Sequence, residues 1–286
     1  MASPFQHSPN VLFETRVDAV ERLSPAFLRI RLAGSGLHHV TPRGLDQRLK
    51  ILLPVAGHGW PEELLAGQPE HSWRRRWRAV AADRRPVLRS YTVSASRPER
   101  AELDLDMYCH ASPGPASRWA QSTRAGETLF LSAPDHRLDR GQGHGVQWRP
   151  GSATRVLLAG DETAFPAIAG IASALPSSVR AEIVLETGDL GDIDWVREVC
   201  TGPGRSVEIV HREPRQAGGA ALVAAVHAWV GAHGAAAREL GDRFYAWSAT
   251  ESQHVARLRE ELTAAGIARR RVHAQGYWND RPRPLG

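Results

Sequence analysis

The run Arg89-Ser90-Tyr91-Thr92 places a guanidinium, an aromatic ring and two hydroxyls within one apolar, strand-like segment, residues 87–95. Because side chains of a strand alternate between its faces, Arg89 and Tyr91 share one face and Ser90 and Thr92 the other. A guanidinium binds phosphate and an aromatic ring stacks on a flat heterocycle, so this segment could hold a flavin nucleotide. An ordinary barrel strand with a surface arginine is the alternative.

A second candidate anion site opens a short predicted helix with Gly114, Pro115, Ala116, Ser117 and Trp119. Proline is well tolerated at the first helical position, and small residues let a ligand approach the backbone. The start of a helix carries unpaired N–H groups and a partial positive charge, which favour a pyrophosphate. A helix that only caps the preceding strands is the alternative.

Two further features could contact the same ligand or a second nucleotide. His110 ends a predicted strand, and its ring could donate to a hydroxyl, a phosphate or a carbonyl, although a structural role is the alternative. Later in the chain a hydrophobic strand ends at Gly160, and Asp161 begins a helix there. Ligands of open parallel sheets bind outside the carboxyl ends of strands. No Gly-x-Gly-x-x-Gly occurs at this position, and Asp161 could simply cap the helix.

Four stretches, taken in order, make the chain similar to the siderophore-interacting proteins, FAD-dependent ferric-siderophore reductases related to ferredoxin reductases. They are Arg89-Ser90-Tyr91-Thr92-Val93; His110 followed by Gly114-Pro115-Ala116-Ser117-Arg118-Trp119-Ala120; Gly160-Asp161-Glu162-Thr163-Ala164-Phe165-Pro166-Ala167-Ile168; and Gly276-Tyr277-Trp278. The resemblance implies an FAD site with its pyrophosphate at the Gly114 helix. It also implies NADH or NADPH as reductant and a ferric siderophore as substrate.

The resemblance also assigns residues of the second half to the cofactor side. It implies that Thr163 and Ala164 lie near the flavin and nicotinamide, so that the loop after Gly160 lines the redox site. It places Tyr277 and Trp278 over the flavin or in the place of the nicotinamide. Terminal aromatic residues that only dock a tail onto a domain are the alternative for this pair.

Substrate binding is expected to depend on cationic side chains, because ferric siderophores are bulky and often anionic. Lys50, the only lysine of the chain, matches a lysine that the family places in this strand, and Arg48 would lie on the same face. Arg137 and Arg257 are the other candidates, in regions where the family carries its remaining basic residues.

Two turns depart from the family pattern and border the expected nicotinamide cleft, residues 132–136 and 248–251. The reductant could therefore be NADH, NADPH or an electron-transfer protein. Glu186, Asp189 and Asp192 would suit a ribose 2′-hydroxyl better than a 2′-phosphate, which favours NADH, whereas Arg212 would favour NADPH.

The elements that position these residues fall into two differently patterned halves. Short alternating apolar runs predict an antiparallel six-stranded FAD-binding β-barrel over residues 1–140, with an insertion at about 57–86. A Gly- and Pro-rich linker spans residues 141–152. From residue 153 to residue 286, strands alternating with helices predict a parallel-sheet, NAD(P)H-binding-like α/β domain with a C-terminal tail, the ferredoxin-reductase-like arrangement.

Composition bounds the remaining classes of function. The 286 residues, 42% of them hydrophobic, favour two domains, and Cys109 and Cys200 give neither a disulfide framework nor a metal spacing. We expect no protein metal site, no signal peptide and no apolar run near 18 residues, hence a cytoplasmic protein without a membrane partner. A flavin-dependent reductase acting on another, biosynthetic substrate and a binding module without reductase activity remain alternatives.

The net charge of +5 and the run Trp73-Arg74-Arg75-Arg76-Trp77-Arg78 would suit a nucleic-acid binder. The run lies in a stretch that also carries acidic residues, so we expect a solvated amphipathic helix with two packed tryptophan rings and no nucleic-acid partner. Within the insertion, this helix could overhang the flavin.

Overall fold

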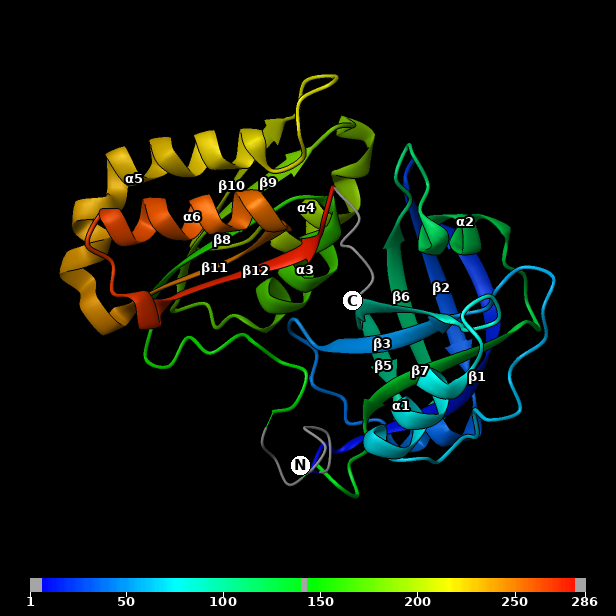
Figure 1. Cartoon of the computed structure of the whole chain (residues 1–286). Coiled ribbons are helices and arrows are strands. Elements are labelled where there is room, and N and C mark those ends of the chain that lie inside the picture. Colours follow the sequence, from blue (N-terminus) through cyan, green and yellow to red (C-terminus); the bar gives the residue numbers. More distant parts are fainter. Residues whose placement is uncertain (1–6, 140–142, 281–286) are drawn as a thin grey trace. The chain divides into compact units, whose positions relative to one another are not determined.

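A computed structural model describes residues 7–139 and 143–280. The chain divides into two compact units, residues 1–146 and 147–286, so the division falls inside the stretch expected to be a linker (Figure 1). Residues 140–142 of the boundary and residues 281–286 of the expected tail lie outside the described part.

The first unit is a curled antiparallel sheet in the strand order β4-β3-β7-β1-β2-β6-β5. Its strands are β1 (Asn10–Arg22), β2 (Phe27–Ala33), β3 (Arg48–Leu53), β4 (Val87–Thr92), β5 (Ala95–Arg97), β6 (Glu102–Tyr108) and β7 (Thr128–Pro134). Alternate apolar residues point inward, and Ile30, Leu32, Leu103 and Leu105 are fully buried in its core. The alternation of apolar residues in the sequence thus corresponds, as expected, to one inward and one outward face of each strand.

The predicted strand over residues 87–95 is divided between the two edges of this sheet. β4 pairs with β3, β5 pairs with β6, and only Val93 and Ser94 join them. The Val93 N–H donates to Gln47 O at 2.8 Å, and the Ser94 N–H donates to Asp104 O at 2.9 Å. One segment of chain thus serves both edges, which accounts for seven strands where six were predicted.

Two α-helices, α1 (Glu70–Ala79) and α2 (Pro115–Ser122), and two 3₁₀ turns, Ser35–His39 and Pro98–Arg100, complete the first unit. α1 carries the tryptophan- and arginine-rich run. Trp73 is fully buried, Trp77 donates its Nε1–H to Pro86 O at 2.8 Å, and Arg74 pairs with Glu70 at 2.6 Å. Packed tryptophans and a neutralised arginine fit the predicted amphipathic helix.

The second unit is a five-stranded parallel sheet in the order β10-β9-β8-β11-β12. Its strands are β8 (Arg155–Gly160), β9 (Arg180–Thr187), β10 (Arg205–His211), β11 (Phe244–Glu251) and β12 (Val272–Trp278); its helices are α3 (Phe165–Ala174), α4 (Asp194–Cys200), α5 (Ala220–Leu240) and α6 (Ser252–Ala264). Short 3₁₀ turns cover Glu162–Ala164, Leu190–Asp192, Gly241–Arg243 and Arg269–Arg271. From β8 the chain adds β9 and β10 on one side of the sheet, and then β11 and β12 on the other side. The carboxyl ends of β8 and β11 therefore form the topological switch point where such sheets bind ligands.

Within the described residues, one helix segment, Ala220–Arg243, is long and apolar enough to cross a membrane by length and composition. The expectation that the chain contains no such segment is wrong. Leu222, Val226 and Trp229 of α5 are buried in a core cluster with residues of β8, β11 and α6. The apolar character of α5 therefore serves packing against the parallel sheet in this structure.

Candidate functional site

Strand β4 presents the faces predicted from its sequence. Arg89 pairs with Ile51 and Tyr91 with Leu49, two buried core residues, so both point to the barrel side of the strand. Tyr91 packs partly buried against that core, and burial raises the pKa of its hydroxyl. Arg89 is exposed and donates to Leu88 O at 2.9 Å. Among the described residues, no carboxylate pairs with the Arg89 guanidinium.

The start of α2 is open to an external anion. Pro115 occupies the first turn, Gly114 precedes it in an extended conformation, and no side chain among residues 7–139 and 143–280 caps the helix. A Cβ placed on Gly114 would meet nothing within 4 Å, so the backbone there is accessible. Trp119 is buried on the same helix, and its Nε1–H has no acceptor within the part of the chain that the structure describes. The N–H groups of the first turn fit a pyrophosphate.

His110 and Ser117 join the end of β6 to this helix. The backbone N–H of His110 donates to Ser117 Oγ at 3.3 Å, and its ring packs edge-on against Tyr108 with centroids 4.7 Å apart. The neighbouring Cys109 lies close enough to Tyr91 for its charge to raise the pKa of the tyrosine, after the larger effect of burial. The structure thus brings the β4 residues, His110 and the α2 start to one end of the first unit.

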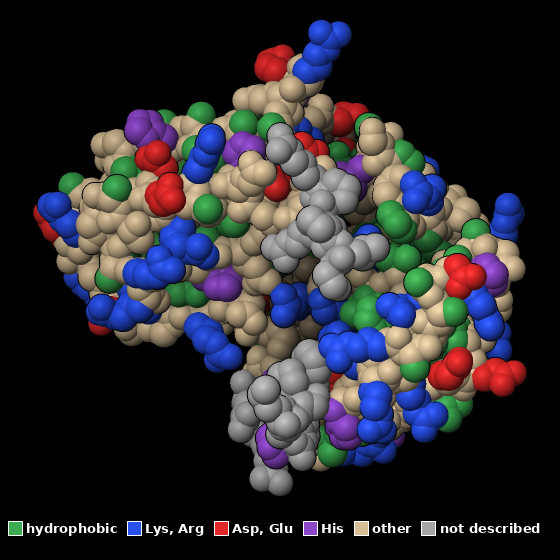
Figure 2. All heavy atoms as spheres, viewed as in Figure 1, with side chains coloured by type: hydrophobic (Ala, Val, Ile, Leu, Met, Phe, Trp, Pro, Cys, Tyr) green, Lys and Arg blue, Asp and Glu red, His purple; other side chains and the backbone are tan. Residues whose placement is uncertain are grey.

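Lys50 and Arg48 lie on the opposite face of β3, as their alternation predicted. Lys50 stands directly across from Ser90, and its Nζ donates to Ser90 Oγ at 2.5 Å. Burial lowers the pKa of Lys50 to about 8, with smaller contributions in the same direction from the charges of Arg48, Arg74 and Arg89. In Figure 2 basic side chains gather over α1, where Arg75, Arg76 and Arg78 are exposed.

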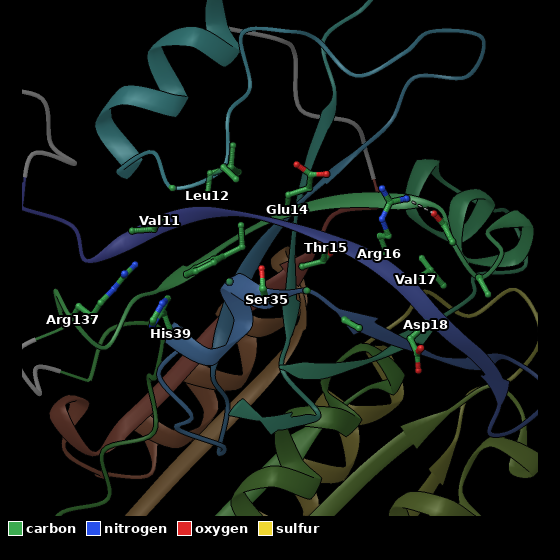
Figure 3. Close-up of a pocket in the computed structure, with 18 residues that line it drawn as sticks. Val11, Leu12, Glu14, Thr15, Arg16, Val17, Asp18, Ser35, His39 and Arg137 are labelled. Atoms are coloured by element: carbon green, nitrogen blue, oxygen red, sulfur yellow. Dashed lines mark hydrogen bonds between the residues drawn. The ribbon is translucent and has the colours of Figure 1, made fainter. Parts of the chain in front are cut away.

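The other two substrate candidates do not join this group. Arg137 pairs with buried Asp135 at 2.5 Å and lines a separate groove of about 780 Å³ along β1. Figure 3 shows Arg137 beside His39 at one end of that groove, which is formed by residues 11–18, 33–36, 66–67 and 125–126 as well. None of the predicted flavin residues lines it. Arg257 lies exposed on α6 of the second unit.

At the carboxyl edge of the parallel sheet, Asp161 is buried and its side chain is fully engaged. Its Oδ1 accepts from the Thr163 N–H at 3.0 Å and the Thr163 hydroxyl at 2.5 Å; its Oδ2 accepts from Thr250 Oγ1 at 2.6 Å and Trp278 Nε1 at 2.8 Å. Burial, and then the charge of Glu162, raise the pKa of Asp161 to about 6 against these hydrogen bonds. The carboxylate ties the ends of β8, β11 and β12 together.

A second set of buried charges lies beside this aspartate. Arg212 contacts Glu162 at 2.6 Å and Glu186 at 2.8 Å. Glu162 also accepts from the Gly188 N–H at 2.8 Å, and Glu186 accepts from the N–H groups of Gly219 and Leu222, both at 2.7 Å. The acids thus occupy backbone donors that a phosphate could otherwise use at the ends of β8 and β9 and at the start of α5.

This network corrects the argument for a preference between NADH and NADPH. Glu186 is fully buried and Asp192 is 1% exposed, while Asp189 accepts from the Gly191 N–H at 2.8 Å. Glu186 and Asp192 are built into the fold, Asp189 caps a 3₁₀ turn and stays exposed, and Arg212 is held between Glu162 and Glu186. Glu186 and Asp192 therefore give no basis for choosing between the two reductants, and the preference for NADH stays a prediction.

The remaining predicted residues of the second unit are packed into the fold. Ala164 is fully buried against Gly160, where an added Cβ would lie 2.5 Å from the Ala164 Cβ. Tyr277 is half-buried and packs edge-on against Trp247 at 6.1 Å. The Trp278 carbonyl accepts from Ser252 Oγ at 3.0 Å. Cofactor contact by Asp161, Thr163, Ala164, Tyr277 and Trp278 stays a prediction.

Sequence reasoning missed Glu162, Arg212 and Thr250 as partners in these networks. The parallel register of β9 and β10 pairs Glu186 with Val210, which brings the following Arg212 close to Glu186. A glutamate ending one predicted strand and an arginine just after the next were the available signal. No group of three or more His, Cys, Asp or Glu side chains that could hold a metal occurs over residues 7–139 and 143–280.

Comparison with curated proteins finds relatives whose names refer to ferric vibriobactin reduction and mycobactin import. The chain is 25% identical over 260 residues to the ferric vibriobactin reductase ViuB of Vibrio cholerae, covering 90% of this chain and 85% of that protein. It is 29% identical over 213 residues to the mycobactin import ATP-binding/permease protein IrtA of Mycolicibacterium smegmatis, covering 73% of this chain. The match spans only 22% of IrtA.

Solved structures show the same fold. The siderophore-interacting protein SipS of Aeromonas hydrophila matches with a TM-score of 0.69 and 24% identity over 95% of this chain and 93% of that one. A siderophore utilization protein from T. fusca matches with a TM-score of 0.70 and 23% identity, over 98% and 97%. A ferredoxin reductase of carbazole 1,9a-dioxygenase matches with a TM-score of 0.63 and 16% identity, over 94% and 70%. The predicted fold class, ferredoxin-reductase-like, is confirmed.

Two family models account for most of the chain. The siderophore-interacting FAD-binding domain matches residues 16–138, and the siderophore-interacting protein model matches residues 153–281. The first range contains β4, His110 and α2, and the second contains the parallel sheet with its carboxylate network. The chain belongs to the siderophore-interacting protein family, as its motifs predicted.

Proposed function

We propose that this protein is an FAD-dependent reductase that uses NADH or NADPH to reduce the iron(III) of a ferric siderophore and release iron(II). When bound, FAD supplies the redox chemistry, accepting electrons from the reductant and passing them to the iron. The proposal is supported by the likeness to a ferric vibriobactin reductase and by the open start of α2 beside β4. A cytoplasmic location is part of the proposal.

The residues of the first unit would hold and orient the cofactor. The N–H groups after Gly114 would bind the pyrophosphate, and the exposed guanidinium of Arg89 would add a charged donor to it. Tyr91 would offer its ring to the flavin from the same face of β4. Iron is the substrate here, and iron(II) leaves because it binds hard oxygen ligands less tightly than iron(III).

An electron-transfer protein is the second candidate for the donor, and one observation favours it. Asp161, Glu162 and Glu186 fill the backbone donors at the sheet edge and place negative charge there. A pyrophosphate approaching this edge would meet carboxylates in place of free N–H groups. A reductase recruited to another substrate and a flavin-binding module without activity are the remaining alternatives to the proposed reaction.

The cofactor assignment predicts a yellow protein with non-covalent FAD. Arg89→Ala should weaken FAD binding by roughly tenfold or more, since a charge-assisted hydrogen bond contributes about 1.5–3 kcal/mol. Arg75→Ala, which removes an exposed arginine of α1, is the matched control. Titration of the apoproteins with FAD, followed by flavin fluorescence, measures both. Equal affinity in a folded Arg89→Ala protein would remove this arginine from the site.

The reaction is tested by anaerobic bleaching of the flavin and by substrate kinetics. Lys50→Ala should raise KM for an anionic ferric siderophore several-fold, corresponding to about 1 kcal/mol for a partly exposed charge, and leave flavin reduction unchanged. The increase should shrink at high ionic strength. If neither NADH nor NADPH bleaches the flavin while dithionite-reduced protein reduces the ferric complex, the donor is a protein. If reduced protein leaves every ferric siderophore oxidised, the reductase proposal fails.

A further inference from the structure

Strand β4 joins the predicted cofactor face to a second polar face. Arg89 and Tyr91 occupy one side, and Ser90 occupies the other, opposite Lys50 of β3. The Lys50 amine donates to the Ser90 hydroxyl at 2.5 Å. Lys50 is the only lysine of the 286 residues. The strand expected to carry the flavin therefore also holds the side chain expected to meet the substrate.

Two hydroxyls flank Lys50 in the sheet, and the amine uses only one. The register places Ser90 of β4 on one side of Lys50 and Ser132 of β7 on the other. The Ser132 hydroxyl is buried and has no hydrogen-bond partner within the described residues, whereas Ser90 is exposed and accepts from the lysine. Ser90 is thus the contact that fixes the amine, and Ser132 offers a matched position for comparison.

The charges around Lys50 would otherwise drive its amine away. Arg48 on its own strand, Arg89 on β4 and Arg74 on α1 all disfavour a second positive charge beside them, and burial adds to this effect. Glu70 of α1 acts in the opposite direction, but its carboxylate already pairs with Arg74 and accepts from Asn10. A flexible lysine chain would relieve the repulsion by swinging its amine into water. The Ser90 hydroxyl opposes that movement.

We propose that Ser90 is a positioning residue that holds the Lys50 amine against the barrel wall beside Arg48, so that the two cations form one fixed receptor for an anionic ligand. This inference rests on the proposed function, in which that ligand is the ferric complex. The receptor loses one of its charges when the amine deprotonates. Its affinity for anions therefore falls as the pH rises through the lowered pKa of Lys50, about 8.

The single lysine permits a direct test. Reductive methylation with carbon-13 labels Lys50 and the terminal amine alone, keeps the charge of the lysine, and leaves it an N–H donor. Titration by NMR should give a pKa near 8 for Lys50 in the wild-type protein. In Ser90→Ala the pKa should rise toward the ordinary 10.5, because the freed amine moves into water. Ser90→Thr should keep the low value, and so should Ser132→Ala.

The same variants test the receptor with a defined probe, the ferric complex of 2,3-dihydroxybenzoate. Wild-type protein should bind it several-fold more weakly at pH 9 than at pH 7. Ser90→Ala should bind it more weakly than wild type at pH 7 and lose most of the dependence on pH, whereas Ser90→Thr should behave as wild type. These readouts need no turnover, so they stand apart from reductase activity.

The outcomes separate the two proposals. An unchanged or lower Lys50 pKa in Ser90→Ala would overturn the positioning role, because the amine would then hold its place without the serine. A shifted pKa with no binding of the ferric complex by any variant would support the tether and count against the siderophore as its ligand. Equal binding by wild type and Ser90→Ala at both pH values would overturn the receptor while leaving the reductase proposal intact.

Discussion

Two helix starts in this molecule differ in whether they leave backbone N–H groups for an external anion. At α2 in the first unit, Gly114 precedes the helix, and no side chain in the described part of the chain accepts from its first N–H groups. At the end of β8 in the second unit, Asp161 accepts from the Thr163 N–H, and nearby Glu186 does the same for the start of α5. A helix start marks a site for an external anion only where the chain supplies no carboxylate of its own.

Substitutions at the carboxylate-capped helix starts of the second unit should lower the free energy of unfolding the most. Glu186→Gln removes the buried charge that faces Arg212 and leaves one of the α5 donors without its acceptor. Loss of roughly 3–5 kcal/mol in the free energy of unfolding is expected, as for breaking a buried ion pair. Urea unfolding followed by circular dichroism measures it, with exposed Glu208→Gln of β10 as the control. Equal losses in the two variants would show that the network is not what stabilises this edge.

Asp161 should make the stability of the second unit depend on pH. Its pKa is raised from 3.8 to about 6 in the folded protein, so the folded state binds a proton more readily than the unfolded chain. Protonation of Asp161 therefore adds its full contribution to the free energy of unfolding below about pH 4, and this contribution is lost as the pH rises through 6. Relative to Asp161→Asn, wild-type protein should lose roughly 3 kcal/mol of unfolding free energy between pH 4 and pH 7. Parallel pH profiles for the two proteins would contradict the raised pKa.

A carboxylate introduced at the start of α2 should make this helix start resemble the one at Asp161. Gly114→Asp places a carboxylate where it can accept from the first turn of α2, as Asp161 does in the second unit. The apoprotein should gain a few tenths of a kcal/mol in stability, while FAD affinity should fall by about tenfold. Gly114→Ala, whose Cβ would meet nothing within 4 Å, controls for the loss of glycine. Unchanged FAD affinity in the aspartate variant would place the pyrophosphate elsewhere.

The open site was readable from sequence because its features are local. Alternation along one strand placed Arg89 and Tyr91 together, and a proline after a glycine marked the start of α2. The break of the predicted strand at Val93 was not readable, since it depends on which strands lie at the two edges of the curled sheet. Local rules describe a segment but not its neighbours.

The closed site was not readable for the same reason. Glu186 and Arg212 meet because β9 and β10 run parallel in one register, and Glu186 reaches α5 because that helix starts above the sheet. Read along the chain, Glu186 looked like a surface acid near a ribose, and Arg212 like a flexible side chain. Burial, which decides between those roles, is a property of the assembled sheet.

The pairing of β1 with β7 also governs how the first unit is made. Asn10 lies opposite Pro134 and Arg16 opposite Thr128. During synthesis, β1 therefore cannot pair on this edge until a partner strand on the order of 120 residues further along the chain has been made. At ordinary rates of synthesis this interval lasts roughly 6–24 seconds, during which the apolar residues of β1 have no strand beside them on that edge. A nascent chain stopped before residue 128 would offer an unpaired hydrophobic strand to other chains. The completed unit should assemble late and all at once.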